Sequence, residues 1–159
     1  LHKIFNKNWL EAIQQFRSGQ PISPSLYYID FATHSIASTV YSFLSIYAHY
    51  LFGPFPWQWQ LSGSFMHIYA GIESVLRMIL LFFSLKHWYE AHGFQRRLLG
   101  LLLLIYLSMT FMWAVGTANY GTAVRHNMLS LWILAIAGVP PLIDKLSNIY
   151  SCIMSKVKL

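Results

Sequence analysis

Charged residues are scarce in this chain of 159 residues. Asp, Glu, Lys and Arg together make up 10% of it, whereas soluble domains average about 25%. Hydrophobic residues make up 56% and aromatic residues 17%. This balance excludes an ordinary soluble domain. It predicts an all-α integral membrane protein, because a helix satisfies its own backbone hydrogen bonds in lipid.

Cysteine is also nearly absent. Cys152 is the single cysteine, which excludes an internal disulfide bond and any metal site built from several thiolates. The formal net charge of +6 comes from Lys and Arg residues placed singly or in pairs between apolar runs. Nucleic-acid binding is not expected, because a nucleic-acid surface gathers its cations on one polar face.

Four apolar stretches are long enough to be predicted as membrane spans, at about residues 36–52, 65–85, 98–115 and 128–143. The fourth is short and ends in Pro140–Pro141, which predicts a span that is tilted, packed against its neighbours or broken near its end. The sequence therefore predicts an integral membrane helical bundle of about four transmembrane helices.

An amphipathic helix is predicted before the first span. Apolar residues between positions 4 and 16 recur at helical spacing opposite Lys7, Asn8, Glu11 and Gln15, a pattern typical of a helix lying in the membrane interface. The expected organisation has three parts. They are an amphipathic segment with its linker (1–30), a four-span transmembrane domain (31–145) and a cytoplasmic basic tail (146–159).

The positions of Lys and Arg predict the orientation, because cytoplasmic loops near spans are enriched in them. They precede the first span, join the second to the third, and follow the fourth, so both termini are predicted to be cytoplasmic. The segments GPFPWQWQLSGS and GTANYGTAVRHN are then expected on the outer face, where Arg125 is a cation placed against the usual bias. The cytoplasmic group comprises Lys3, Lys7, Arg17, Lys86, Arg96, Arg97, Lys145, Lys156 and Lys158.

Glu73 and Arg77 stand four residues apart inside the second span, on one face of the predicted helix. A charged side chain deep in lipid costs roughly several kcal/mol, so the pair is expected to face protein or a wet cavity. Two interpretations stay open. The pair is either a structural lock between helices, or Arg77 lines a cavity, held in place by Glu73, and binds phosphate with its planar guanidinium.

Three histidines, His49, His67 and His126, are expected near the outer interface. They raise the alternative of a haem or metal site, although no paired histidine or cysteine motif supports it. Trp57 and Trp59 follow two prolines in the outer loop. They fit an interfacial aromatic belt, and they also fit a platform for the face of a sugar ring.

Three motifs carry a resemblance to a known group of proteins. GPFPWQ, ESVLR and GTANYGTAVRH resemble the C-terminal region of polytopic bacterial membrane proteins of surface-polysaccharide biosynthesis, which are similar to O-antigen or capsule repeat-unit polymerases. The resemblance covers about residues 27–141. It implies a bacterial cytoplasmic (inner) membrane protein that uses no cofactor and transfers sugars carried on polyprenyl diphosphate, at the outer face of the membrane.

The resemblance also implies roles for particular residues. Arg125 and Arg77 would bind the diphosphate, and His126 would act as the base on an acceptor hydroxyl, because histidine titrates near neutral pH. Further contacts to the lipid-linked oligosaccharide are expected from Glu73, Asn119, Tyr120, Gly121, Trp57, Trp59 and His67.

The chain departs from the pattern of these polymerases in two places. Asn127 follows His126 where an Arg-His-Arg triplet is expected, and four spans replace about ten or more. Earlier helices or a partner membrane subunit would supply the remaining spans. The alternative from another class is a non-catalytic membrane subunit or small channel, in which Glu73 and Arg77 only lock helices together.

Overall fold

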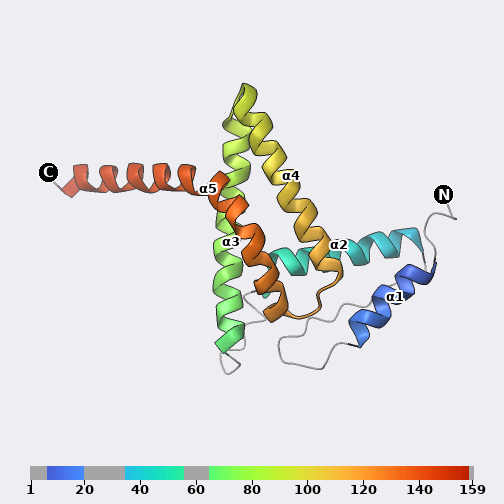
Figure 1. Ribbon diagram of the computed structural model, residues 1–159. Coiled ribbons are helices and arrows are strands. Elements are labelled where there is room, and N and C mark those ends of the chain that lie inside the picture. Colours follow the sequence, from blue (N-terminus) through green and yellow to red (C-terminus); the bar gives the residue numbers. More distant parts are fainter. Residues whose placement is uncertain (1–6, 20–34, 56–64, 158–159) are drawn as a thin grey trace.

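The computed structural model describes residues 7–19, 35–55 and 65–157 of the chain (Figure 1). Within these ranges the protein is built from helices and short connections, so the predicted all-α fold is confirmed. The five helices are α1 (Lys7–Ser18), α2 (Ile36–Phe52), α3 (Phe65–Glu90), α4 (Gly93–Val115) and α5 (Tyr120–Val157).

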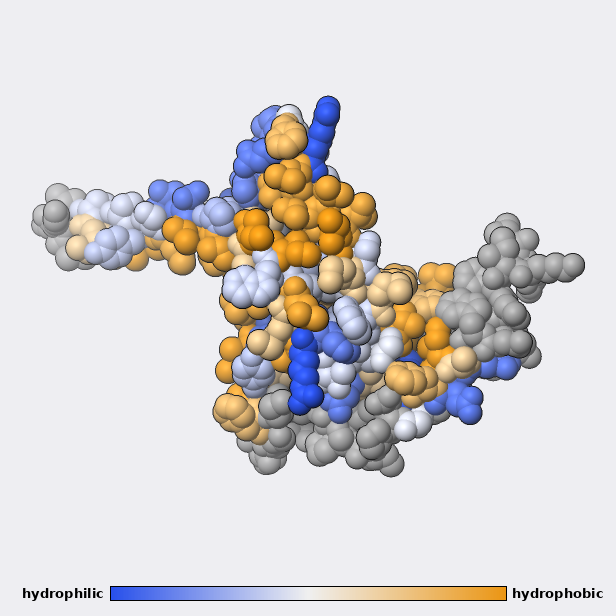
Figure 2. Space-filling view, viewed as in Figure 1, coloured by the Kyte–Doolittle hydropathy of each residue, from blue (hydrophilic) through white to orange (hydrophobic). Residues whose placement is uncertain are grey.

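Three of the described helices are long and apolar enough to cross a membrane, in the segments Ile68–Glu90, Gly93–Val115 and Tyr120–Ser155. Many of their large apolar side chains are exposed, and hydrophobic residues cover much of the visible surface of the bundle (Figure 2). In water such a surface would be unstable, whereas lipid solvates it. The chain is therefore a helical membrane protein.

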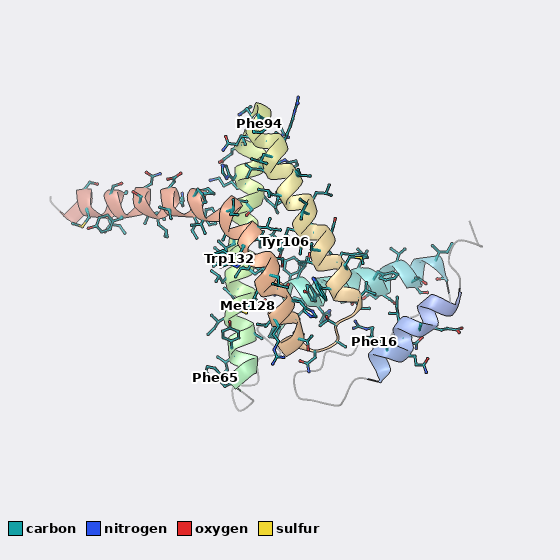
Figure 3. The ribbon with its side chains drawn as sticks, in the orientation of Figure 1. Phe16, Phe65, Phe94, Tyr106, Met128 and Trp132 are labelled. Carbon is teal, nitrogen blue, oxygen red and sulfur yellow. The ribbon has the colours of Figure 1, made fainter. Side chains whose placement is uncertain are left out.

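Helices α3 and α4 form a hairpin whose connection is residues 91–92, with Gly93 at a positive φ of 58°. Phe65 and Phe94 mark its two ends (Figure 3). The first half of α5 packs along α3. There Gly138 lies so close that an added Cβ would come within 2.5 Å of the Leu80 carbonyl oxygen. Glycine is needed at this position because any side chain would push the two helices apart.

Helix α2 differs from the predicted first span. It has 17 residues, and it runs across α4 and α3 rather than alongside them (Figure 1). Its last turn meets Ser74 and Arg77, about 14 to 18 Å along α3 from Phe65 at 1.5 Å per residue. The helix has the predicted bounds, 36–52, and its C-terminal end contacts the middle of α3.

Helix α5 also differs from the prediction, because it continues through Pro140 and Pro141 to Val157. The chain changes direction near the prolines, and the second half leaves the bundle sideways (Figure 1). Pro141 has no N–H to donate to the Ala137 carbonyl four residues earlier. His87 Nδ1 of α3 donates to that oxygen instead, at 2.9 Å, so the hydrogen bond lost at the proline is replaced from another helix.

Candidate functional site

The predicted pair of Glu73 and Arg77 lies in the interior of the bundle. Arg77 Nη1 is 3.0 Å from Glu73 Oε1, and the two residues are 2% and 7% exposed. Arg77 Nε also donates to the Leu51 carbonyl at 2.9 Å, and Ser74 Oγ donates to the Phe52 carbonyl at 2.8 Å. These carbonyls end α2, where no further turn supplies N–H donors.

These contacts give Arg77 a structural task. A buried carbonyl left without a donor costs about 1–3 kcal/mol, and Arg77 supplies such a donor while Glu73 compensates its charge. Arg77 therefore fastens α2 to α3. The guanidinium is engaged by Glu73 of its own helix and by the Leu51 carbonyl at the end of α2, which favours the lock over the phosphate-binding interpretation.

Two further polar side chains are buried near this level. Tyr106 is 0% exposed, points from α4 into the bundle (Figure 3) and interacts electrostatically with Arg77 and Glu73. Asn127 is 1% exposed. Ser84 of α3 contacts Leu134 of α5, 50 positions later in the chain. About two turns earlier on both helices, the same offset of 50 places Asn127 opposite Arg77. An arginine at position 127 would bring a second guanidinium into this interior.

The start of α5 accounts for three of the predicted substrate-binding residues. Asn119 Oδ1 accepts from the Gly121 N–H at 2.7 Å, which is the geometry of an N-cap. The Tyr120 side chain is buried, and an added Cβ at Gly53 would lie 2.7 Å from its ring. Asn119, Tyr120 and Gly121 thus start α5 and join it to the end of α2.

Arg125 and His126 were expected in a loop, but both lie on α5, because the helix begins at Tyr120. Arg125 is exposed, and His126 is half-buried with its ring stacked on Trp113 at 4.0 Å between centroids. His126 Nδ1 is also 3.4 Å from Thr117 Oγ1. The structure therefore gives these adjacent residues different surroundings, with Arg125 facing outward and His126 resting against the end of α4.

Arg17 is a site residue that sequence reasoning missed. Its side chain is 2% exposed, and Nη1 donates to the carbonyls of Ala114, Val115 and Thr117 at 3.2, 3.4 and 2.8 Å. The guanidinium thus closes the C-terminal end of α4. The sequence carries no signal for this contact, because a single arginine in a polar amphipathic segment looks like a solvated charge.

The Arg17 contact bears on the expected arrangement of the chain about the membrane. The charge distribution placed Arg17 and the Thr117 segment on opposite sides, whereas the two are hydrogen-bonded. Helix α1 therefore lies at the end of the bundle where α4 finishes and α5 begins. Residues Lys86, Arg96 and Arg97 lie near the α3–α4 connection, at the other end.

Three predicted residues cannot be placed at the site. Trp57 and Trp59 lie outside the described residues, and His67 lies in α3 with a side chain that is also outside the description. His49 packs edge-on against Phe55 and contacts the Ser45 carbonyl through Nδ1 at 2.9 Å. Among the described residues, no three His, Cys, Asp or Glu side chains gather as a metal site.

The described part of the site thus has two levels. A buried level holds Glu73, Arg77, Tyr106 and Asn127, and an outer level at one end of the bundle holds Arg17, Trp113, Thr117, Arg125 and His126. The outer level combines an exposed guanidinium with a partly accessible imidazole, a pair that suits binding of an anion next to a proton acceptor. No family model, curated protein or solved structure matches the chain.

Proposed function

We propose that this chain belongs to the machinery of bacterial surface-glycan assembly and takes part in glycosyl transfer from polyprenyl-diphosphate-linked sugars. The proposal rests on the motif resemblance and on one structural observation. Arg125, Met128 and Trp132 are all exposed, and their spacing of three and four residues puts them on one face of α5. A guanidinium directly above an apolar, lipid-facing stripe fits a diphosphate whose prenyl chain lies in the bilayer.

The proposal assigns different tasks to the two adjacent residues. Arg125 contacts two phosphate oxygens at once through its planar guanidinium, which lysine cannot do. His126 accepts the proton of the acceptor sugar hydroxyl, and the Trp113 ring and Thr117 Oγ1 hold the imidazole in position. Arg77 and Glu73 have a structural role, since their contacts fasten α2 to α3.

The proposal places the Arg125 end of the bundle at the outer face of a bacterial inner membrane, where lipid-linked sugars are presented for polymerisation. Arg17 bonds to Thr117 at this end, so α1 lies on the outer side as well. The second half of α5 leaves near His87, at the opposite end, and belongs to the cytoplasmic side. This arrangement keeps Lys86, Arg96 and Arg97 cytoplasmic, in agreement with the usual charge bias.

The test compares point variants in bacteria whose surface glycan depends on this protein. Arg125→Lys is expected to lower polymer formation about tenfold or more, because one charge-assisted hydrogen bond is lost. His126→Gln is expected to lower turnover about 100- to 10,000-fold at normal protein level. Arg97→Lys is the matched control, an exposed arginine at the other end that should change nothing.

The measurements are glycan chain length, accumulated lipid-linked oligosaccharide and the amount of protein in the membrane. Wild-type glycan from both Arg125→Lys and His126→Gln would refute the proposed chemistry. Accumulated lipid-linked oligosaccharide with normal protein level would support it, because the substrate is then made but not consumed.

A second candidate function is a non-catalytic membrane subunit, favoured by the contacts of Arg77. Within the described residues, this side chain bonds to Glu73 and to the Leu51 carbonyl at the end of α2, which gives the intramembrane charge a structural explanation. A subunit would lose function through Arg77 and Arg17 variants, which disturb assembly, and would tolerate His126→Gln. The same set of variants therefore separates the two candidates.

A further inference from the structure

The second half of α5, residues 142–157, is an amphipathic helix that projects from the bundle. Its large apolar side chains are exposed and recur every three to four positions, so they occupy one face. They are Ile143, Leu146, Ile149, Tyr150, Ile153 and Met154. Asp144, Asn148, Ser151, Cys152 and Ser155 fall on the opposite face.

This segment is too short to be another span. Its 16 residues extend for about 24 Å at 1.5 Å per residue, whereas crossing the hydrocarbon core takes about 20 apolar residues. The first half of α5 already provides this length between Tyr120 and Pro140. Because the first half of α5 ends at one membrane surface, the second half begins at that surface.

The direction of the segment is built into the fold. Pro140 and Pro141 remove two helical N–H donors, and His87 Nδ1 holds the freed Ala137 carbonyl against α3. Gln95 Nε2 donates to His87 Nε2 at 3.0 Å, which keeps the imidazole oriented with its Nδ1 hydrogen toward the carbonyl. The bend therefore lies at the α3–α4 connection end of the bundle, and the segment leaves sideways from there (Figure 1).

The segment turns its apolar face toward the level of the spanning helices and its polar face away from it, as a helix on a membrane surface does. In Figure 2 its hydrophobic side chains gather along the lower edge, toward the level of the spanning part of the bundle, and its hydrophilic side chains along the upper edge. Lys145 is exposed beside the apolar face, and Lys156 follows eleven positions, about three turns, later. Lys86, Arg96 and Arg97 lie at the same end of the bundle.

We infer that residues 142–157 form an interfacial helix that lies on an anionic lipid leaflet at the α3–α4 connection end of the bundle. The apolar face enters the boundary of the acyl chains, the Lys145 side chain reaches the lipid phosphates, and Lys156 adds positive charge about three turns later on the same helix. The basic residues of the connection extend the same positive surface. The bend at Pro140 and Pro141 fixes the direction in which the helix meets the leaflet.

The test uses the full chain in vesicles of phosphatidylcholine with phosphatidylglycerol and a spin label at single cysteines. Native Cys152 reports the polar face, and Ile153→Cys in a Cys152→Ser background reports the apolar face one residue away. The label at 153 should collide with oxygen dissolved in lipid, and the label at 152 with a water-soluble nickel reagent. Lys145→Gln and Lys156→Gln should each lower about fivefold the ratio of chains whose segment 142–157 lies on the lipid to chains whose segment lies in water.

Three results would overturn the inference. Access of the nickel reagent to both positions would mean that the helix lies in water. Protection of position 153 from both reagents, with coupling between labels, would mean that a second copy covers the apolar face. Equal lipid contact in pure phosphatidylcholine and in both lysine variants would remove the anionic leaflet as the partner.

Discussion

Replacement of Arg77 by methionine is the sharpest test of how the bundle is held together. The change removes the partner of Glu73 and the donor to the Leu51 carbonyl while keeping a long side chain. A hydrogen bond between helices in a membrane is worth only about 0.6 kcal/mol on average. An ion stranded in the interior costs about 3–5 kcal/mol, so the stranded carboxylate dominates the expected loss.

The double variant Glu73→Gln/Arg77→Met distinguishes these two contributions. Because it removes the stranded charge, it should recover most of the stability and leave a deficit of about 1–2 kcal/mol from the Leu51 carbonyl. Arg97→Met, at an exposed position, is the control and should stay within about 0.5 kcal/mol of wild type. The free energy of unfolding is measured by denaturant titration of the purified protein in mild detergent.

The reasoning is refuted if Arg77→Met unfolds within about 1 kcal/mol of the wild-type protein, since a stranded buried charge costs more. It is equally refuted if the double variant is no more stable than Arg77→Met. In that case the loss comes from the end of α2 and not from Glu73, and the ion pair has no role of its own.

Three other changes test the remaining contacts. Gly138→Val should destabilise the bundle by about 1–3 kcal/mol, because its Cβ would lie 2.5 Å from an α3 carbonyl; an unchanged melting temperature would contradict the close α3–α5 contact. Asn119→Ala should cost about 0.5–2 kcal/mol by loss of the α5 cap, whereas Asn119→Ser should restore most of it in the same melting assay. An impermeant thiol reagent should reach the cysteine introduced by Gln15→Cys in a Cys152→Ser background, and native Cys152, from opposite sides of the membrane. Reaction at both positions in intact cells would exclude the arrangement with α1 at the Thr117 end.

Part of the candidate site could be predicted from local spacing. Glu73 and Arg77 are four residues apart in an apolar helix, so their contact follows from helical geometry alone. The prolines at 140 and 141 predicted a span that is tilted, packed or broken near its end, whereas α5 changes direction there and stays helical to Val157. What Arg77 fastens could not be predicted, because Leu51 lies 26 positions away and its carbonyl carries no sequence signature.

The membrane environment and the helical fold were determined by composition and by the length of the apolar runs, because lipid admits helices whose backbone bonds are internal. Which helix ends meet was decided by tertiary contacts. Arg77 and Ser74 donate to the carbonyls at the end of α2 inside the bundle. Arg17 donates to the end of α4, 97 positions away at Ala114. Charge counting treats every lysine and arginine as solvated, so it cannot detect an arginine that the folded chain withdraws from solvent to satisfy a distant helix end.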